Sequence, residues 1–572
     1  MKPETLNDLI SKSKKFGADF HGTFNAKLFD APKDTIVITG TLQKDQDEVL
    51  KEIDSLGLAD KVKEVVFNNT ENIEGENVGK FKANKIKEKE LDLFLENDPM
   101  QVYWIKKYNP EANVIYINRL NYIIFSYTLD GFPYALRLKE EGNNVVMAIL
   151  SPEDAGVEVK TDGEKEEEKR RNQIGDGLIK KFPAKLVFDF LKGFSGDKNE
   201  YFIDFDFNYG GEYGEKLEKM GYKGLFTRPL GRELEKDRQK SQEMVKEYFK
   251  KLVLPDEKEF KNTEEALNYI QKKQKIYVVK PDNPELTCFV PLSETFEEYL
   301  EEVQSLFNAE KAKLEEGFII QEKIDKPVEV APEVHYVNGE PVAFIAGIEN
   351  KPIGSGNCGP QVGCTNDLAF IIDKDSKLID IACKDYFPIA KKEKLNNFMD
   401  AAVLFDRVDE TPYFSEFCSF RKGYNCFITE MAMLPSVSHY FESIKQGKNP
   451  FNTKLFQFEK KIKSFGASIR IFNLDQDENR FCKGETQIQI KGKDVWLWDG
   501  KIDKGQIVTT GQTKDVAVIT GAGDTPEEAI QNAISNIQEI TMKDMYYRND
   551  IDSKEWFGLI SRYNWLKENK YI

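Results

Sequence analysis

Three polar residues in apolar strand patterns have the chemistry to bind phosphate and a metal ion. Lys280 ends the apolar run in "YVVKPDN", Glu322 ends that in "GFIIQEKI", and Glu416 lies within "PYFSEFCSF". An ammonium group binds phosphate oxygens as a point charge, and carboxylates are suitable ligands for a hard cation such as Mg²⁺. The ordinary alternatives are a solvated strand terminator at Lys280 and a plain edge-strand residue at Glu416.

The segments that must position these residues divide into four parts. Residues 1–110 contain a strand, an amphipathic helix and a second strand, which predict a small α/β unit; the charged run 80–92 is interpreted as a linker or an exposed helix. Residues 111–231 alternate strand-like and helix-like runs, so we expect a parallel α/β layer. The charge-rich stretch 161–173 is interpreted as a solvated loop or helix face.

The second half of the chain has a different pattern. Residues 232–460 begin with a long charged helix over 232–252 and continue with strands that suggest an antiparallel sheet. Residues 461–572 predict short strands and one helix, "TPEEAIQNAISNIQEI". His335 falls in a predicted strand and His439 in a helix-like stretch, so both are interpreted as structural residues.

Composition limits the possible functions. The chain has 572 residues, too many for one core, and its net charge of −17 argues against a general duplex-binding protein. We expect a cytoplasmic protein, because neither a signal peptide nor a membrane span is evident and the seven cysteines are scattered from Cys288 to Cys482. With three histidines, a His-rich metal site is improbable, and a catalytic metal would be a hard ion held by carboxylates and phosphate oxygens.

The stretch "SGNCGPQVGC", residues 355–364, is dense in glycine and follows an expected two-strand hairpin. It could be a metal knuckle, a redox pair or a loop that lets a ligand approach the backbone. Cys358 and Cys364 are too far apart for a zinc knuckle or a CxxC pair, which favours the ligand loop.

The C-terminal part resembles the glycinamide ribonucleotide synthetase (phosphoribosylamine–glycine ligase) family. The matching residues form a helix start and a closing motif: Gly523, Asp524, Thr525, Glu527, Glu528 and Ala529, then Met545, Tyr547, Arg548, Asp550 and Ile551. Thr525 is suited to cap that helix, and Pro526 fits its first position.

The resemblance extends to the glycine-dense stretch, where Gly359, Pro360 and Gly363 match the family's substrate loop. The order of Lys280, Glu322 and Glu416 is the order used by ATP-grasp enzymes. The implied fold class is α/β and α+β multidomain: a parallel α/β pre-ATP-grasp domain over 111–231, an ATP-grasp domain of two subdomains over 232–460, and a small β-rich C-terminal domain with one helix over 461–572.

The resemblance implies an ATP-dependent ligase of purine synthesis that joins a carboxylate to an amine through an acyl phosphate, with ATP and Mg²⁺ (or Mn²⁺) as cofactors. The implied partners are small-molecule substrates, without membrane or nucleic acid, and the implied state is a monomer. The implied site residues are Lys280 and Arg238 at the nucleotide phosphates, Glu322 at adenine, Glu329 at ribose, Glu416 and Cys418 at the metal, and Arg421 at substrate or phosphate.

Several departures leave three functions open. The family has E-x-N at the metal, whereas this chain has Glu416-Phe417-Cys418, and a thiol is a poor Mg²⁺ ligand that Asn425, Glu430 or water would have to replace. The strand after Lys280 reads "KPDNPELTCFV", without the family's glycine flap. The protein is therefore a diverged phosphoribosylamine–glycine ligase, a ligase for another carboxylate and amine such as an amino acid and a modified nucleotide, or a non-catalytic nucleotide-binding relative.

Overall fold

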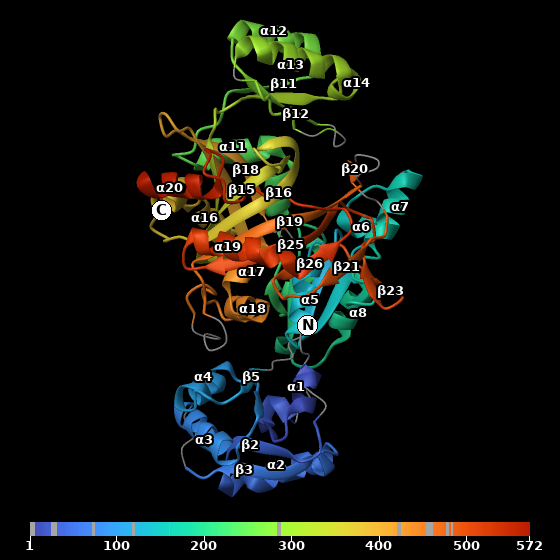
Figure 1. The fold of residues 1–572 in the computed structure, drawn as a ribbon, viewed down its shortest axis with the longest axis vertical. Helices are drawn as coiled ribbons and strands as arrows, with labels where there is room; N and C mark the ends of the chain where they lie inside the picture. Colours follow the sequence, from blue (N-terminus) through green and yellow to red (C-terminus); the bar gives the residue numbers. More distant parts are fainter. Residues whose placement is uncertain are drawn as a thin grey trace.

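The computed structural model describes residues 6–572, except for 25–30, 71–74, 117–120, 160, 283–285, 287, 294, 420–424, 454–460, 476–479 and 482–483. Three bodies follow one another along the long axis of the molecule: an N-terminal unit at one end, a large middle body, and a small sheet with its helices at the other end (Figure 1). None of the helices in the described ranges is long and apolar enough to cross a bilayer.

The N-terminal unit is a parallel sheet with the strand order β3-β2-β1-β4-β5. Its strands and three larger helices are β1 (Phe16–Ala18), β2 (Thr35–Leu42), β3 (Val62–Asn68), β4 (Leu93–Glu96), β5 (Val114–Tyr116), α2 (Gln46–Ser55), α3 (Gly75–Glu88) and α4 (Pro99–Tyr108). The predicted strand–helix–strand is confirmed as β2, α2 and β3. The interpretation of 80–92 as a linker or exposed helix is wrong, because α3 buries Phe81 and Lys82 against the sheet.

A second parallel sheet, with the order β10-β9-β6-β7-β8, confirms the α/β layer expected after the N-terminal unit. Its elements include β6 (Asn121–Ser126), α5 (Phe132–Glu140), β7 (Asn144–Ile149), β8 (Lys180–Pro183), α8 (Ala184–Gly193), β9 (Tyr201–Phe205), α9 (Gly211–Lys219) and β10 (Lys223–Leu225). Pro133 stands in the first turn of α5, where its missing N–H costs no hydrogen bond. The charged stretch after β7 forms α7 (Asp162–Arg171), which has no buried residue and is a solvated helix as expected.

The expected long helix over 232–252 is two helices, α10 (Pro229–Lys236) and α11 (Arg238–Tyr248). Asp237 interrupts them with an extended backbone (φ −110°, ψ 97°), and its side chain caps α11 by accepting a hydrogen bond from the Lys240 amide. Charged residues follow one another on both sides of Asp237, so the sequence pattern did not reveal the break between the two helices.

A small antiparallel sheet with the order β11-β13-β12 follows, at the end of the molecule farthest from the N-terminal unit (Figure 1). Its elements are β11 (Glu257–Phe260), α12 (Thr263–Lys273), β12 (Tyr277–Pro281), α13 (Phe296–Ala309) and β13 (Phe318–Glu322). The helices and strands share one apolar core that includes Ile270, Tyr299 and Ile320.

The middle body is built on a large antiparallel sheet with the order β18-β17-β14-β15-β16-β19-β25-β22. Its main elements are β14 (Val328–Val337), β15 (Glu340–Gly354), β16 (Cys358–Ile371), α15 (Lys377–Ala382), α16 (Phe387–Lys392), β17 (Phe398–Phe405), β18 (Pro412–Ser419), α17 (Asn425–Met433), α18 (Val437–Lys445), β19 (Phe465–Asp475), β22 (Val495–Leu497), β25 (Asp515–Gly523), α19 (Pro526–Asn536) and α20 (Leu559–Glu568). The antiparallel sheet expected in this region is confirmed. Strands from the C-terminal part, β19, β25 and β22, extend it.

Two local predictions in this body are confirmed. Asn338 and Gly339 join β14 to β15 with positive φ at both positions (52° and 80°), which a tight hairpin turn of this hand requires. Thr525 caps α19, because its hydroxyl accepts a hydrogen bond from the Glu528 amide at 3.1 Å.

Candidate functional site

One face of the large sheet is lined with acidic side chains. Residues directly opposite each other on antiparallel strands share a face, and the pairs Glu333 with Asp400 and Glu349 with Asp367 are in register. Alternation along the strands then gives a face that carries the following residues: Glu329, Glu333, His335, Glu349, Asp367, Asp400 and Glu416. The opposite face is apolar and packs against α15, α16 and α20.

Lys351 lies between three of these carboxylates. Its Nζ is 2.7 Å from Glu329 Oε1, 3.5 Å from Glu349 Oε1 and 3.7 Å from Glu416 Oε1. Burial lowers the pKa of Lys351, but the charges of Glu329, Glu349 and Glu416 outweigh it and hold that pKa well above its ordinary value. The predicted ribose and metal residues, Glu329 and Glu416, are thus brought together, and the lysine between them was missed.

Glu416 is the most open member of this acidic group, which we call the Lys351 cluster (Glu329, Glu349, Lys351 and Glu416). Its side chain is 54% exposed, against 22% for both Glu329 and Glu349. Mg²⁺ commonly binds through one or two carboxylates together with substrate phosphates, and an exposed carboxylate beside other acidic groups fits that role.

Cys418, the second predicted metal residue, lies two positions along β18 and in register with Asp400. Its amide donates a hydrogen bond to Asp400 Oδ1 at 3.0 Å. Burial, followed by the charges of Glu333 and Glu416, raises the pKa of Asp400 well above its ordinary value. Asp400 places a carboxyl group opposite Cys418 in the sheet, and sequence reasoning missed it because it belongs to another strand.

Lys280 and Glu322 lie on the small sheet, on the neighbouring strands β12 and β13. Glu322 forms an ion pair with Lys275 at 2.6 Å. The segment that leads into this sheet pairs with β18, because Val253 exchanges two backbone hydrogen bonds with Pro412 and Phe414. Burial, followed by the charges of Asp409 and Glu322, raises the pKa of Tyr413 on β18.

The glycine-dense stretch is mostly strand rather than loop. Residues up to Gly354 end β15, and Cys358 begins β16, so the predicted substrate residues Gly359, Pro360 and Gly363 are in β16. The expectation of a loop was wrong because the glycines serve an irregular hairpin: the pairing shifts register twice, and Gly359 and Gly363 have φ of 85° and 81°.

The tip of this hairpin is held by the closing motif of the C-terminal part. Arg548 is fully buried, pairs with Asp550 at 2.6 Å and donates to the Pro352 carbonyl at 3.1 Å. Asp550 in turn accepts a hydrogen bond from the Gly356 amide at 2.7 Å. The two motifs that carried the family resemblance are therefore in direct contact.

Two predicted residues have side chains outside the described part. Arg238 is the first residue of α11, and its side chain is not described; Arg421 lies in the segment 420–424, outside the described residues. Their assignments to the nucleotide and to substrate stay predictions.

The N-terminal unit contains a buried cluster that sequence reasoning missed. Lys82 Nζ lies 2.7 Å from Asp19 Oδ1 and 2.6 Å from Glu96 Oε2, and all three residues are at most 5% exposed. Burial and the charge of Asp19 raise the pKa of Glu96 to about 8. We call these three residues the Lys82 cluster.

The position of the Lys82 cluster in the sheet suggests a binding site. Asp19 follows β1, and Glu96 ends β4. These two strands are neighbours in the sheet, and the strand order reverses between them. Ligands of open parallel sheets bind at the carboxyl ends of the strands at such a point. Asp19 and Glu96 come directly after apolar strand runs, and this pattern could have indicated a site. Lys82 could not be recognised as their partner, because it was in a segment interpreted as a linker or an exposed helix.

Similar solved structures include two that carry the name of the family the sequence resembles. A phosphoribosylamine–glycine ligase from Thermotoga maritima is 16% identical, with 75% of this chain and 99% of that chain covered and a TM-score of 0.48. A phosphoribosylglycinamide synthetase from Anaerococcus prevotii is 13% identical, with coverages of 74% and 99% and a TM-score of 0.43. A biotin carboxylase in complex with an ATP analogue from Campylobacter jejuni is 11% identical, with coverages of 78% and 96% and a TM-score of 0.48. No protein-family model and no curated protein matches the chain.

Proposed function

We propose that the chain is an ATP-dependent carboxylate–amine ligase of the ATP-grasp type. The observation that carries this proposal is the division of the charged residues between two sheets joined at β18. Lys280 and Glu322 are on the small sheet, and the Lys351 cluster is on the large sheet. A nucleotide between the two sheets would have basic groups for its phosphates and a carboxylate for its metal ion.

Each residue has a role in this proposal. Lys280 neutralises the phosphates of ATP, and Lys351 shifts from its carboxylates toward the transferred phosphoryl group. Glu416 would hold a phosphate-bound Mg²⁺, which supplies charge neutralisation when bound. The γ-phosphoryl group passes to a substrate carboxylate and ADP leaves. The amine nitrogen then attacks the acyl carbon, phosphate leaves with the bonding electrons, and the nitrogen loses a proton to give the amide.

The first test is nucleotide binding. Calorimetry with Mg²⁺-ATP should show saturable binding to the native chain, and Lys280→Ala should weaken it at least tenfold. Lys258→Ala is the matched control, because Lys258 is exposed on β11 of the same small sheet. No binding at millimolar ATP, or equal binding by Lys280→Ala, contradicts the proposal.

The second test identifies the reaction. We propose glycine and phosphoribosylamine as the substrates, since the C-terminal motif and the glycine-dense stretch resemble that family. ADP release that requires both compounds, with formation of the amide, supports this reaction. ADP release only with another acid or amine selects a ligase of different substrates. Binding of ATP without ADP release for any pair of acid and amine selects the non-catalytic relative. The placement of Lys351 among the carboxylates is the observation that supports this alternative.

We propose a second activity for the N-terminal unit, supported by the Lys82 cluster. A hydrogen-bond donor lies beside Asp19, because the ammonium group of Lys82 is 2.7 Å from its Oδ1. A carboxylate next to such a donor can act as a nucleophile toward a phosphate monoester. Asp19 would attack phosphorus, the alcohol would leave with the electrons of the P–O bond, and water would hydrolyse the aspartyl phosphate.

Hydrolysis of p-nitrophenyl phosphate in the presence of Mg²⁺ tests this second activity. Asp19→Asn should reduce the rate at least a hundredfold, whereas Asp60→Asn, an exposed acidic residue of the same unit, should not change it. Absence of hydrolysis by the native chain, or full activity of Asp19→Asn, contradicts the assignment without touching the ligase proposal.

A further inference from the structure

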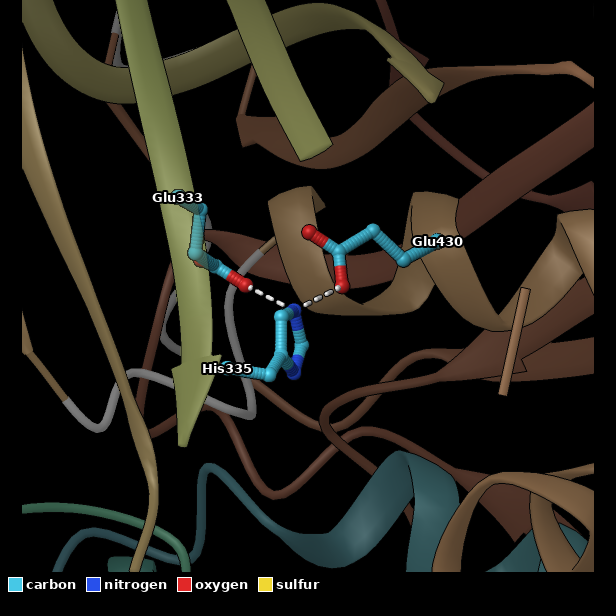
Figure 2. A group of neighbouring side chains, drawn as sticks. All are labelled: Glu333, His335 and Glu430. Atoms are coloured by element: carbon cyan, nitrogen blue, oxygen red, sulfur yellow. Dashed lines mark ion pairs between the residues drawn. The ribbon is translucent and has the colours of Figure 1, made fainter. Parts of the chain in front are cut away.

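A second buried group lies farther along the acidic face of the large sheet. Glu333 and His335 alternate on β14, so both point to that face, and Glu430 reaches them from α17 (Figure 2). His335 Nε2 is 2.7 Å from Glu333 Oε1 and 3.5 Å from Glu430 Oε2. The three residues are 5%, 1% and 2% exposed in chain order, so water does not separate their charges.

Helix α17 is pressed closely against the sheet at this place. A Cβ atom on Gly466 of β19 would lie 2.4 Å from the Thr429 carbonyl oxygen. Because Thr429 precedes Glu430, the close approach of the helix fixes the distance from which Glu430 reaches β14. The Glu333–His335–Glu430 site is thus built by packing and does not depend on a loop.

The ligand atoms of this site have no partner outside the group. Glu333 Oε1, His335 Nε2 and Glu430 Oε2 are buried, and apart from the ion pairs of the imidazole with the two carboxylates none makes a hydrogen bond with the described residues. Buried polar atoms nearly always have such a partner, and each exception needs an explanation. Here the three exceptions are mutual neighbours, with their ligand atoms all within 4.8 Å of one another.

Acidic groups outnumber basic groups around the site. Asp400 is opposite Glu333 in the sheet, and Asp367 lies on the same face. Of the basic residues on this face in the described part, Lys351 is engaged by the Lys351 cluster and Arg470 pairs with Asp515 at 3.2 Å. A buried excess of carboxylates is costly unless a cation compensates it.

The orientation of His335 suits a metal ligand. Its Nδ1 lies 2.9 Å from the hydroxyl of Tyr440, and the ring packs against Phe398 and Phe451. A hydrogen bond from Nδ1–H to that hydroxyl oxygen leaves the lone pair of Nε2 directed at the two carboxylates. A hydrogen-bonding partner behind the ring, on the nitrogen that does not face the metal, is usual for a metal-binding histidine.

We propose that Glu333, His335 and Glu430 bind one divalent transition-metal cation of the Zn²⁺ or Mn²⁺ class. One imidazole nitrogen and two carboxylate oxygens are a donor set of intermediate hardness, which suits these ions better than Mg²⁺. Bonds of about 2.0–2.2 Å place tetrahedral ligands about 3.4 Å apart. The His335–Glu430 distance of 3.5 Å already agrees with that spacing, the His335–Glu333 distance of 2.7 Å is shorter than it, and the three ligand atoms all lie within 4.8 Å of one another.

The bound ion is structural in this proposal. It ties β14 to α17 in the interior, with the fourth position taken by water or by the second oxygen of a carboxylate. It differs from the nucleotide-bound metal at Glu416 because its ligands come from β14 and α17 and because the ion needs no nucleotide. The site therefore goes beyond the proposed ligase function and stands independently of it.

The test uses the full chain after removal of metals by a chelator. Titration with Zn²⁺, and with Co²⁺ as a spectroscopic probe, is carried out without nucleotide. We expect one equivalent bound, a visible absorption spectrum of tetrahedral or five-coordinate Co²⁺, and an increase of at least 5 °C in the melting temperature. X-ray absorption of the Co²⁺ form should show one imidazole in an otherwise oxygen-donor shell.

His335→Gln and Glu430→Gln should no longer bind the one equivalent of Zn²⁺ or Co²⁺, whereas His439→Gln should still bind it. His439 is the matched control, since it is also buried but its Nε2 lies 2.7 Å from the Pro450 carbonyl oxygen. Should the two site variants fail to fold, the wild-type spectrum decides. No bound Zn²⁺ or Co²⁺ at 100 µM, or a bound Co²⁺ without an imidazole ligand, overturns the proposal and leaves His335 as an internal cation between two carboxylates.

Discussion

The Lys82 cluster and the Lys351 cluster have the same composition, a lysine between carboxylates, but different access to solvent. Lys82, Asp19 and Glu96 have side chains exposed by 4%, 7% and 0%. Lys351 is 23% exposed, and its partner Glu416 is 54% exposed. The first cluster has little contact with solvent, and Asp19 is its most accessible member, whereas the second opens widely through Glu416.

The difference in solvent access implies different roles for Lys82 and Lys351. In the closed cluster, each short ion pair is a requirement for folding, because an unpaired buried charge is strongly destabilising. In the open cluster, the lysine can exchange a partner for a ligand phosphate without leaving a charge buried and unpaired. The same residue types therefore give a lysine held by two short buried ion pairs in one unit and an adaptable cation in the other.

Lys82→Met should produce the largest effect. It leaves two buried carboxylates without their cation and should destabilise the N-terminal unit by about 3–5 kcal/mol. Hydrogen exchange should show a loss of protection of two to three orders of magnitude in peptides from α3 and β4. Lys89→Met is the control, because its pair with Glu64 is at the surface and should contribute at most about 1 kcal/mol. Equal effects of the two variants would remove the distinction between closed and surface pairs.

Lys351→Met should have a smaller effect on stability, about 1–3 kcal/mol, because Glu416 can remain hydrated. The three carboxylates left behind should then bind an added divalent cation. We expect millimolar Ca²⁺ or Mg²⁺ to raise the melting temperature of Lys351→Met but not that of Lys351→Arg, which keeps the charge. A variant insensitive to both cations would show that the carboxylates do not converge on one point.

Within the Lys351 cluster, the buried and the exposed carboxylate should differ. Glu329→Gln removes the partner at 2.7 Å and should cost about 1 kcal/mol, whereas Glu416→Gln should stay within about 0.5 kcal/mol. Glu416→Gln should instead weaken Mg²⁺-ATP binding. Chemical denaturation and calorimetry on the same samples separate the two effects, and a larger loss of stability for Glu416→Gln would reverse the assigned roles.

The last prediction concerns the pH dependence of stability and rests on a buried carboxyl that has hydrogen bonds but no lysine. Asp206 accepts hydrogen bonds from Ser126 Oγ and the Gly131 amide, and burial together with the charge of Asp130 raises its pKa to about 8. The folded state holds this proton more tightly than the unfolded chain does. The contribution to stability is therefore complete below about pH 4 and is lost as the pH rises to about 8, by up to about 1.4 kcal/mol per pH unit.

Asp206→Asn should make the free energy of unfolding less dependent on pH between pH 5 and pH 8, as measured by urea unfolding. Asp162→Asn, at a side chain that is 99% exposed, should leave the slope as in the native chain. An unchanged slope in Asp206→Asn would assign the proton to another of the buried carboxyls.

Sequence patterns were sufficient where the signal is local. Lys280, Glu322 and Glu416 were placed correctly on strands, and the cap of α19 was found, since each depends on a few neighbouring residues. Lys351 was missed because its role arises only when three strands converge. The glycine-dense stretch was interpreted as a loop because glycine marks both turns and irregular strands, and only the register distinguishes the two.

The contact between the hairpin tip and Arg548–Asp550 also sets an order of assembly on the ribosome. Gly356 and Asp550 are 194 positions apart, so the hairpin tip has to wait for almost the whole chain to emerge. The N-terminal sheet is complete once β5 ends at Tyr116. At about 5–20 residues per second, roughly 20 to 90 s of synthesis separate the two events. Until β19 and β25 emerge, the nascent large sheet exposes the edge of β16, and an unpaired edge of this kind is a site for aggregation.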